Sequence, residues 1–509
     1  LITRPRRFGK SLNLNMLECF FSEKYRGEGE LFRGLSIWNH EKYREIQGTY
    51  PVIFFSFADI KGQTFTSARE AICQVIQDLY AEFGFLKESE RLSQEEKDYF
   101  SLVAPTMSDA VAAMSLKRLS MCLHSYYGKK VLIFLDEYDT PLQEAYMYGF
   151  WDELTGFMRG LFNSTFKTNP YLERALFTGI TRVSKESIFS DLNNLTVITT
   201  TSEQYADCFG FTETEVFDAL EKYGMSDRQV EVQTWYDGFS FGNKKDIYNP
   251  WSIMNYAKRK KLISYWVNTS ANSMIKTALK QANYTFKNQY DKLIKDGKLD
   301  TYVSMQTSFF EEADNSTLWG LFVNAGYLTV TKEIDLLKGK YRIEIPNKEV
   351  KQEFIKLTEY QLGLSSGTLD TVTESLAKED QETFLESYQE ILMVPSYHDL
   401  QKENSYHMMM LGMCLCLNKD YEIISNREVG KGRDDLILKA KDEKKTSFVL
   451  EFKYLKEDKK DLEKALDELS NKAIQQIKDN KYDYGLKGKV IYIGLAHHGK
   501  DVSIKWVES

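Results

Sequence analysis

The chain has 509 residues, of which 42% are hydrophobic and 28% charged, and its net charge is −8 at pH 7. This composition excludes a disordered or low-complexity polymer, and the acidic balance argues against a whole surface built to bind nucleic acid. At roughly 100–200 residues per domain, the length predicts two to four domains.

Six cysteines without a Cys-x-x-Cys pair predict neither a disulfide framework nor a structural zinc site, so we expect a protein of the reduced cytoplasm. The longest apolar run, residues 408–417, is about half of the roughly 20 residues that a membrane helix needs, so no membrane partner is expected. The chain begins at Leu1 within a short strand, and we expect native sequence to precede it.

The first half of the chain alternates apolar, β-rich runs with segments of helical periodicity. The predicted strands are residues 51–57, 130–135, 174–180 and 195–199. The predicted helices between them include residues 67–83 and 151–166. Near-continuous hydrophobicity suits strands covered on both faces, so we predict an α/β fold with a parallel sheet whose ligands bind at the carboxyl ends of the strands.

Residues 4–11, RPRRFGKS, begin a helical stretch directly after the first strand. Backbone N–H groups at a helix N-terminus bind phosphate, the ammonium of Lys10 would reach the β- and γ-phosphates, and the Ser11 hydroxyl would coordinate Mg²⁺. Gly9, Lys10 and Ser11 are therefore candidate ATP-binding residues. Arg4 stands where this pattern usually has its first glycine, so only half of the motif is present, and a chance helix start is the alternative.

The strand at 130–135 leads into Asp136 and Glu137. Carboxylates at the end of a buried strand suit the acidic partner of a phosphate loop, in which Asp136 would hold Mg²⁺ and Glu137 would polarise the attacking water. The alternative is that these acids cap a helix beginning near Thr140. Because the phosphate-binding candidate lies in the same predicted sheet, we favour nucleotide binding.

A third strand ends at Thr181 and Arg182, which could sense the γ-phosphate at the sheet edge. Arg182 could equally pair with an acidic side chain at the surface. The cationic Arg4, Arg6 and Arg7 could contact phosphate or lie in solvent. Both alternatives stay open in each case.

From about residue 270 the pattern changes to helix, two β-like runs at 327–331 and 341–345, and a helix start at Pro346 and Asn347. This order predicts a helical or winged-helix-like middle module, followed by a linker at 363–367. A further α/β unit comes after it. Its predicted helices are 372–393, 403–417 and 459–479, and its predicted strands are 421–426, 434–438, 447–452 and 489–495. We therefore predict three domains, at residues 1–269, 270–366 and 367–509.

Asp435 begins one strand of the last unit, and Glu451 and Lys453 occupy alternate positions of the next. Alternate side chains of a strand share a face, and hairpin pairing would place Asp435 beside Glu451. Two carboxylates and a lysine can bind Mg²⁺ and orient a water for attack on a phosphodiester. The alternative is an exposed antiparallel strand with a Glu/Lys face.

Two predicted helices add polar groups to this unit. Glu403 and His407 begin a helical face that continues with Met410 and Cys414. Glu403 is a candidate outer metal ligand or proton-handling group, whereas His407 is better explained as a core histidine. Gln476 lies at the edge of an apolar stripe and could bind a DNA phosphate, support the lysine, or simply end the stripe.

Together these motifs resemble the AAA-ATPase-like family with its C-terminal PD-(D/E)XK nuclease domain. The segments that carry the resemblance are residues 4–11, 134–139, 179–183, 209–212, 235–238, 248–251, 265–270, 432–435 and 451–453. The resemblance implies a P-loop ATPase of the additional-strand type and a restriction-endonuclease-like core. It also implies that Lys10 and Ser11 bind nucleotide and Mg²⁺, that Asp136 and Glu137 are the acidic pair, and that the nuclease triad is Asp435, Glu451 and Lys453.

The sequence thus predicts an ATP-binding and ATP-hydrolysing protein with a Mg²⁺-dependent DNA endonuclease domain whose cleavage depends on the nucleotide state. Arg4 in place of the first glycine leaves hydrolysis, as opposed to binding, open. The alternative function is a nucleotide-dependent switch that binds DNA or protein without cutting, and a third is an interaction protein with a vestigial phosphate loop. A homo-oligomer is also left open.

Overall fold

The computed structural model describes most of the chain in two compact units. The first unit comprises Leu1–Ala278 and Asp300–Val350, and the second comprises Leu279–Leu299 and Lys351–Ser509. The description leaves out residues 184–187, 190–191, 193, 267–274, 278, 280–282, 306–313, 362–366, 394–405, 407–408, 411–412, 415–416, 418–419, 426–427, 430–431, 434 and 457–460. Within the described part of the chain, every helix is too short or too polar to cross a membrane. The predicted domain boundaries stay predictions.

The first unit is built on a parallel sheet, as predicted. Its strands are β1 (Ile2–Thr3), β4 (Leu172–Gly179), β3 (Val131–Asp136) and β2 (Val52–Ser56), in that order. All neighbouring pairs are parallel, and Ile2 also forms a parallel bridge to Ile198 on its other side. The segment after β1 therefore leaves from the interior of the sheet and not from its edge.

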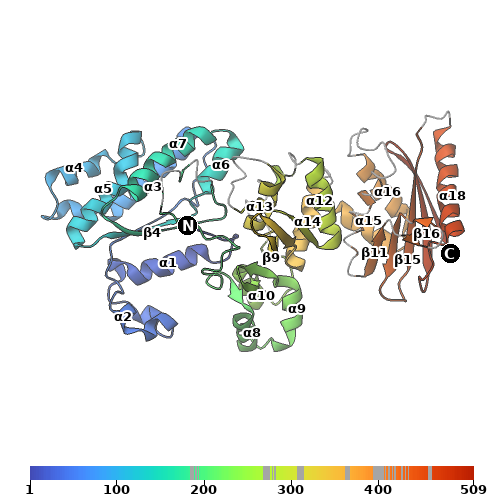
Figure 1. Ribbon diagram of the computed structural model, residues 1–509, viewed down its shortest axis with the longest axis horizontal. Helices are drawn as coiled ribbons and strands as arrows, with labels where there is room; N and C mark the ends of the chain where they lie inside the picture. The colour runs from blue at the N-terminus through green and yellow to red at the C-terminus, as the bar shows by residue number, and fades with distance from the viewer. Residues whose placement is uncertain are drawn as a thin grey trace. The chain divides into compact units, whose positions relative to one another are not determined.

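Helices cover both faces of this sheet (Figure 1). One face carries α1 (Lys10–Phe21), and the other carries α3 (Phe65–Glu82), α5 (Asp109–Tyr127) and α7 (Trp151–Phe162). All six residues of β3 are buried, which explains its continuous hydrophobicity. The predicted helix at 151–166 is α7 followed by a π-helical turn, Asn163–Lys167.

Shorter elements complete the first unit. Its further helices are α2 (Glu41–Arg44), α4 (Gln94–Leu102), α6 (Thr140–Tyr148), α8 (Glu213–Lys222), α9 (Gln229–Tyr236) and α10 (Pro250–Arg259). A small antiparallel sheet has the order β5 (Phe211–Thr212), β7 (Lys244–Tyr248) and β6 (Phe239–Phe241).

The predicted pair of strands in the middle of the chain is present. It is β9 (Thr329–Asp335) paired antiparallel with β10 (Lys340–Glu344), after α13 (Asn315–Ala325). The order of the sheet is β8-β10-β9, and β8 (Lys298–Tyr302) was not predicted. The predicted helix start is also confirmed, because Asn347 Oδ1 accepts the Val350 N–H at 3.0 Å at the beginning of α14 (Lys348–Gln361).

The second unit is built on a mixed sheet. Its order is β11 (Tyr421–Ser425), β14 (Leu436–Ala440), β15 (Ser447–Tyr454), β16 (Val490–His498) and β17 (Asp501–Glu508). Only β15 and β16 pair in parallel. The short strands β12 (Glu428–Val429) and β13 (Gly432–Arg433) form a separate ribbon. The strand β15 is central and buried, so the alternative of an exposed Glu/Lys strand is wrong.

Helices lie on both faces of the mixed sheet. Leu436 and Leu450 belong to the apolar cluster beneath α15 (Thr368–Ala377) and α16 (Gln381–Leu392). Ile437 and Val449 belong to the cluster beneath α18 (Leu462–Asn480). The helix α12 (Tyr284–Asp296) also belongs to this unit. Alternation along each strand thus divides the core into two layers.

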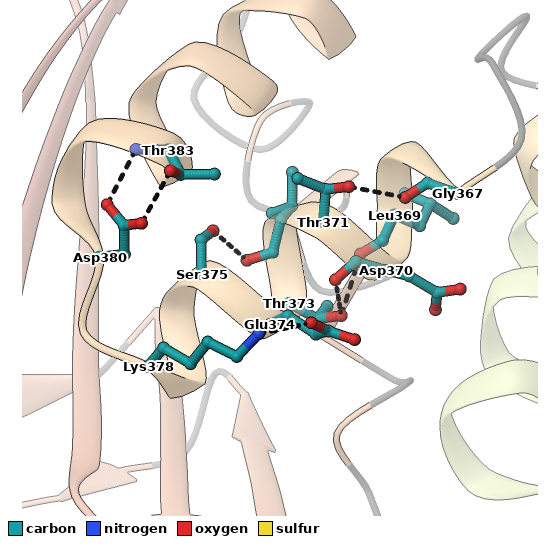
Figure 2. A network of polar contacts seen from close by, with 11 residues as sticks. Gly367, Leu369, Asp370, Thr371, Thr373, Glu374, Ser375, Lys378, Asp380 and Thr383 are labelled. Atoms are coloured by element: carbon teal, nitrogen blue, oxygen red, sulfur yellow. Dashed lines mark hydrogen bonds and ion pairs between the residues drawn. The ribbon is translucent and has the colours of Figure 1, made fainter.

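The sequence predicted a single helix at 372–393, and this prediction is wrong. Figure 2 shows the turn between α15 and α16, where Asp380 accepts the N–H of Thr383 at 3.1 Å and its hydroxyl at 2.7 Å. Glu379 has a φ of 60°, which ends α15 before this cap begins α16. The predicted helix at 403–417 lies mostly outside the described residues, but Met410 and Cys414 are buried as its apolar stripe predicted.

Candidate functional site

In the loop between β1 and α1, several backbone carbonyl groups accept hydrogen bonds from other groups of the protein. Lys10 Nζ donates to the carbonyls of Arg4 and Pro5, both at 3.0 Å. The Arg6 carbonyl accepts two side-chain donors, and the Phe8 carbonyl accepts the Gly210 N–H at 3.3 Å. By contrast, the backbone N–H groups of residues 7–12 donate to no group in the described part of the chain. The loop therefore presents a row of unused donors, which suits an anion.

Two residues of this loop have left-handed backbone. Gly9, the N-cap of α1, has a φ of 83°, and Arg7 has a φ of 67°. An added Cβ at Gly9 would meet only Asn13 Nδ2 at 3.8 Å, so the backbone angle and not lack of space favours glycine. Ser11 is exposed in the first turn of the helix.

Lys10 is buried, with 5% of its surface exposed. Burial lowers the pKa of its ammonium, while the carboxylates of Glu137, Asp139 and Asp136 act in the opposite direction. The two carbonyl acceptors use two of its three N–H donors. Lys10 is thus fixed across the loop, close enough to the acidic end of β3 for these charges to act on it.

Arg4 lies neither at a phosphate nor in solvent, the two alternatives that the sequence left open. Its guanidinium is buried and donates to the carbonyls of Thr3 and Thr199 at 2.9 and 2.7 Å and to that of Tyr205 at 3.2 Å. Burial lowers its pKa to about 10. Arg4, which stands at the position of the motif's first glycine, therefore links the start of the loop to the segment that contains Thr199 and Tyr205. Arg7 stacks on Trp251, 4.3 Å from the ring centroid.

The acidic end of β3 is bonded to its neighbours. Asp136 is buried and accepts a short hydrogen bond from the Thr178 hydroxyl on β4. Glu137 has a φ of 49° and accepts the Thr140 hydroxyl at 3.2 Å. A glutamate in this backbone region is disfavoured by about 1 kcal/mol or more, so the surrounding structure holds it there.

Asp139 belongs to the acidic segment after β3, for which the sequence left a role beside the phosphate loop and helix capping open, and its side chain makes no cap bond. Its Oδ2 instead accepts the N–H groups of Ile180 and Thr181 at 3.1 and 2.8 Å and the Thr181 hydroxyl at 2.9 Å. An added Cβ at Gly179 would lie 2.7 Å from Asp139 Oδ1, so glycine makes room for this carboxylate. The contact orders the end of β4 against the end of β3.

Thr181 and Arg182 were predicted as nucleotide sensors. The Thr181 hydroxyl donates its hydrogen bond to Asp139 Oδ2. Arg182 lines a cavity of about 700 Å³ together with Thr199 and Ser304, and neither Lys10 nor Ser11 lines that cavity. The structure thus places these two side chains near one strand end but in different surroundings.

In the second unit, the register brings Asp435 opposite Glu451. Leu436 pairs with Leu450 across β14 and β15, so the preceding residue of one strand faces the following residue of the other. Asp435 Oδ2 accepts the Phe452 N–H at 2.8 Å. Glu451 is 2% exposed, so its carboxylate lies within the protein. Asp435 directly precedes β14, and Glu451 lies on the adjacent strand β15.

Lys453 and Gln476 both contact Glu451. Lys453 Nζ donates to Glu451 Oε1 at 2.8 Å and to the Phe452 carbonyl at 3.0 Å, and Gln476 Nε2 forms a short hydrogen bond to the same carboxylate oxygen. The sequence left open whether Gln476 binds a DNA phosphate, supports the lysine or ends the apolar stripe, and the contact observed is with Glu451, so its role stays a prediction. The structure thus brings these three predicted side chains together, with Asp435 beside them.

Carboxylate oxygens are the ligands that Mg²⁺ prefers, so the chemistry of Asp435 and Glu451 fits this ion. The described residues contain no cluster of three or more His, Cys, Asp or Glu side chains arranged to hold a metal. Glu403, predicted as an outer ligand, and His407 lie outside the described residues.

Comparison with known proteins identifies both halves of this arrangement. Residues 1–189 match the family described as predicted AAA-ATPase, and residues 401–507 match the PD-(D/E)XK nuclease superfamily. The resemblance seen in the motifs is thereby confirmed, and the chain joins an ATPase-like segment to a nuclease-like segment.

One curated relative is an uncharacterized protein from the vnfD 5′ region of Azotobacter chroococcum mcd 1. It is 29% identical over 355 residues, or 69% of this chain. The chain spans 61% of the length of that protein.

Proposed function

We propose that the chain binds and hydrolyses ATP with Mg²⁺ in its first unit and cleaves DNA with Mg²⁺ in its second, and that the nucleotide state gates cleavage. The observation that carries the nuclease proposal is the contact of Lys453 and Gln476 with the buried carboxylate of Glu451. Burying a carboxylate costs free energy even when it is paired, so an acid held in this way by a lysine and an amide is a candidate for a functional site. We also propose that residues 270–366 act as a winged-helix-like module.

The ATP site would use the loop as an anion cradle. The unused N–H groups of residues 7–12 would bind the phosphate oxygens, and Lys10 would add a charge to them. Ser11 and Asp136 supply oxygen ligands of the kind that Mg²⁺ takes, and Glu137 would orient the attacking water. Thr181 and Arg182 are proposed to respond to the γ-phosphate from the end of β4.

The nuclease site would use Asp435 and Glu451 to hold Mg²⁺, with Glu403 as an outer ligand. The ion supplies Lewis-acid stabilisation of the charge that develops on the phosphodiester. Lys453 would position the attacking water and stabilise the developing charge from its place 2.8 Å from Glu451. Gln476 would fix the orientation of the Glu451 carboxylate.

Two single substitutions test the two sites separately. Lys10→Ala should abolish ATP binding, and Glu451→Ala should reduce Mg²⁺-dependent DNA cleavage by at least about a hundredfold, as loss of a metal-holding carboxylate does. Lys456→Ala, close to the nuclease site in sequence but in a solvent-facing segment, serves as the control. Mg²⁺-dependent cleavage that survives Glu451→Ala would reject the site.

Gating has its own readout in the same experiment. Adding ATP should change the cleavage rate of the unaltered chain and leave that of Lys10→Ala unchanged. DNA or RNA that is bound but never cut, with either Mg²⁺ or Mn²⁺, would favour the alternative of a nucleotide-dependent switch.

A further inference from the structure

The loop between β1 and α1 is called the phosphate loop below. Midway along it, the Arg6 carbonyl accepts hydrogen bonds from two side chains that are distant in sequence. Asn249 Nδ2 donates to it at 3.3 Å, and the Trp266 indole N–H donates at 3.2 Å. Both donor residues are buried. They belong to the sequence motifs at 248–251 and 265–270, to which the proposed function assigns no role. The Arg6 carbonyl is thus held by two fixed donors.

A third residue, Glu349, holds both donors in place. Asn249 is the N-cap of α10 and accepts the Ser252 N–H at 3.2 Å. The Ser252 hydroxyl in turn donates to Glu349 Oε2 at 2.8 Å, and the backbone N–H of Trp266 donates to Glu349 Oε1 at 2.9 Å. Glu349 is 1% exposed. One buried carboxylate therefore fixes the start of α10 and the backbone of Trp266 together.

The direction of a loop carbonyl determines where the next N–H points. In a trans peptide, the C=O and the following N–H point in opposite directions. Holding the Arg6 carbonyl toward Asn249 and Trp266 therefore turns the Arg7 N–H to the other side of the loop. Arg7 has a φ of 67°, which a residue with a Cβ rarely adopts without outside support. The two donors supply support of this kind.

We infer that Asn249, Trp266 and Glu349 are positioning residues that hold the phosphate loop in the conformation that binds a polyphosphate. This inference rests on the proposed binding of ATP by the loop. None of the three needs to touch the ligand. Their contribution is to orient the Arg6–Arg7 peptide before binding, so that the ligand does not have to reorganise the loop.

The test is the affinity of the full chain for inorganic pyrophosphate and for Mg²⁺-ATP, measured by calorimetry. Trp266→Phe keeps an aromatic ring beside Tyr327 but removes the indole donor. Asn249→Ser keeps a side chain that can cap α10 but removes the amide donor. Glu349→Gln keeps the size of the side chain. Each variant should bind both ligands about tenfold more weakly, the effect of losing one well-placed hydrogen bond to an oriented group.

Two matched controls separate positioning from general loss of stability. Trp319→Phe alters another buried tryptophan of the first unit, and Glu353→Gln alters a buried glutamate one turn further along α14. Both controls should bind pyrophosphate within twofold of the unaltered chain. Circular dichroism in the near ultraviolet establishes that each protein is folded at the temperature of measurement.

The outcomes distinguish this inference from the proposed function. If the unaltered chain binds neither pyrophosphate nor ATP, the proposed function fails and the inference fails with it. If the unaltered chain binds but folded Trp266→Phe and Asn249→Ser bind equally well, only the inference is overturned. Equal weakening by the controls would also overturn it. If Trp266→Phe does not fold, Asn249→Ser decides the question.

Discussion

His497 on β16 is a histidine in an apolar core, where a charged imidazolium would be poorly solvated. Its ring stacks on Tyr406 with the centroids 3.9 Å apart, and its Nε2 lies 2.9 Å from the Tyr388 hydroxyl. Burial lowers the pKa of His497 to about 3. The imidazole is therefore neutral in the folded protein over the physiological range, with a structural role in the second unit.

This shift makes the stability of the second unit depend on pH. The folded-state pKa lies below the ordinary value of about 6.5, so the unfolded chain takes up a proton first as the pH falls. Stability is therefore lost below about pH 6.5, by roughly 3 kcal/mol at pH 4. Denaturant unfolding between pH 7 and pH 4 measures this loss.

His497→Phe should flatten that pH dependence, whereas His40→Gln, at an exposed position, should leave it unchanged. An unaltered slope in His497→Phe would show that other groups cause the acid sensitivity.

At the scale of elements, the contact of Gln476 with Glu451 in the proposed nuclease site depends on the close approach of α18 to β16. Gly494 pairs in register with Glu451 across β15 and β16. A Cβ added at Gly494 would collide with the Ser470 carbonyl and lie 3.1 Å from Ala473 Cβ, both on α18. Glycine thus lets the helix pack close enough for Gln476 to reach Glu451.

Gly494→Ala should therefore push α18 away from the sheet. We expect the free energy of unfolding to fall by about 1–3 kcal/mol, as in other overpacked cores, and DNA cleavage to fall more than stability alone explains. Denaturant unfolding and cleavage rates measure the two effects. Gly156→Ala on α7, where an added Cβ meets nothing within 4 Å, should be neutral or slightly stabilising. Full cleavage by folded Gly494→Ala would contradict the proposed role of Gln476.

The elements themselves were largely predictable, and the misses have physical causes. The strands β2 and β3 were found because both faces are covered, which makes their sequences continuously apolar. The strand β4 is buried only at its carboxyl end, and the apolar run there was enough to predict it. The strand β17 was missed because its pattern is mixed and most of its residues are only partly buried. The break between α15 and α16 was missed because helical periodicity continues across a connection of only three residues, 378–380.

At the scale of the whole molecule, the two compact units should unfold separately. Each has its own sheet and its own apolar core. Calorimetry should therefore resolve two transitions. A ligand at a hundred times its dissociation constant stabilises the unit that binds it by about 2.7 kcal/mol.

Mg²⁺-ATP should accordingly raise the midpoint of the first unit by roughly 4 °C and leave that of Lys10→Ala unmoved. The Glu451→Ala variant should keep the shift and so serves as the control. A single transition that shifts as a whole would show instead that the units unfold together.

The sequence by itself determined the parallel sheet of the first unit, the presence of a second α/β unit and the neighbouring positions of Asp435, Glu451 and Lys453. Periodicity and short motifs are local properties, and they can be read without knowing which segments meet. Only the tertiary structure decided three sets of contacts. The buried Arg4 guanidinium donates to the Thr199 carbonyl, Asp139 accepts hydrogen bonds from the end of β4, and Asn249 and Trp266 donate to the Arg6 carbonyl. These contacts join residues that are 41 to 260 positions apart. Such pairs leave no local pattern, because their partners are chosen by the packing of the chain.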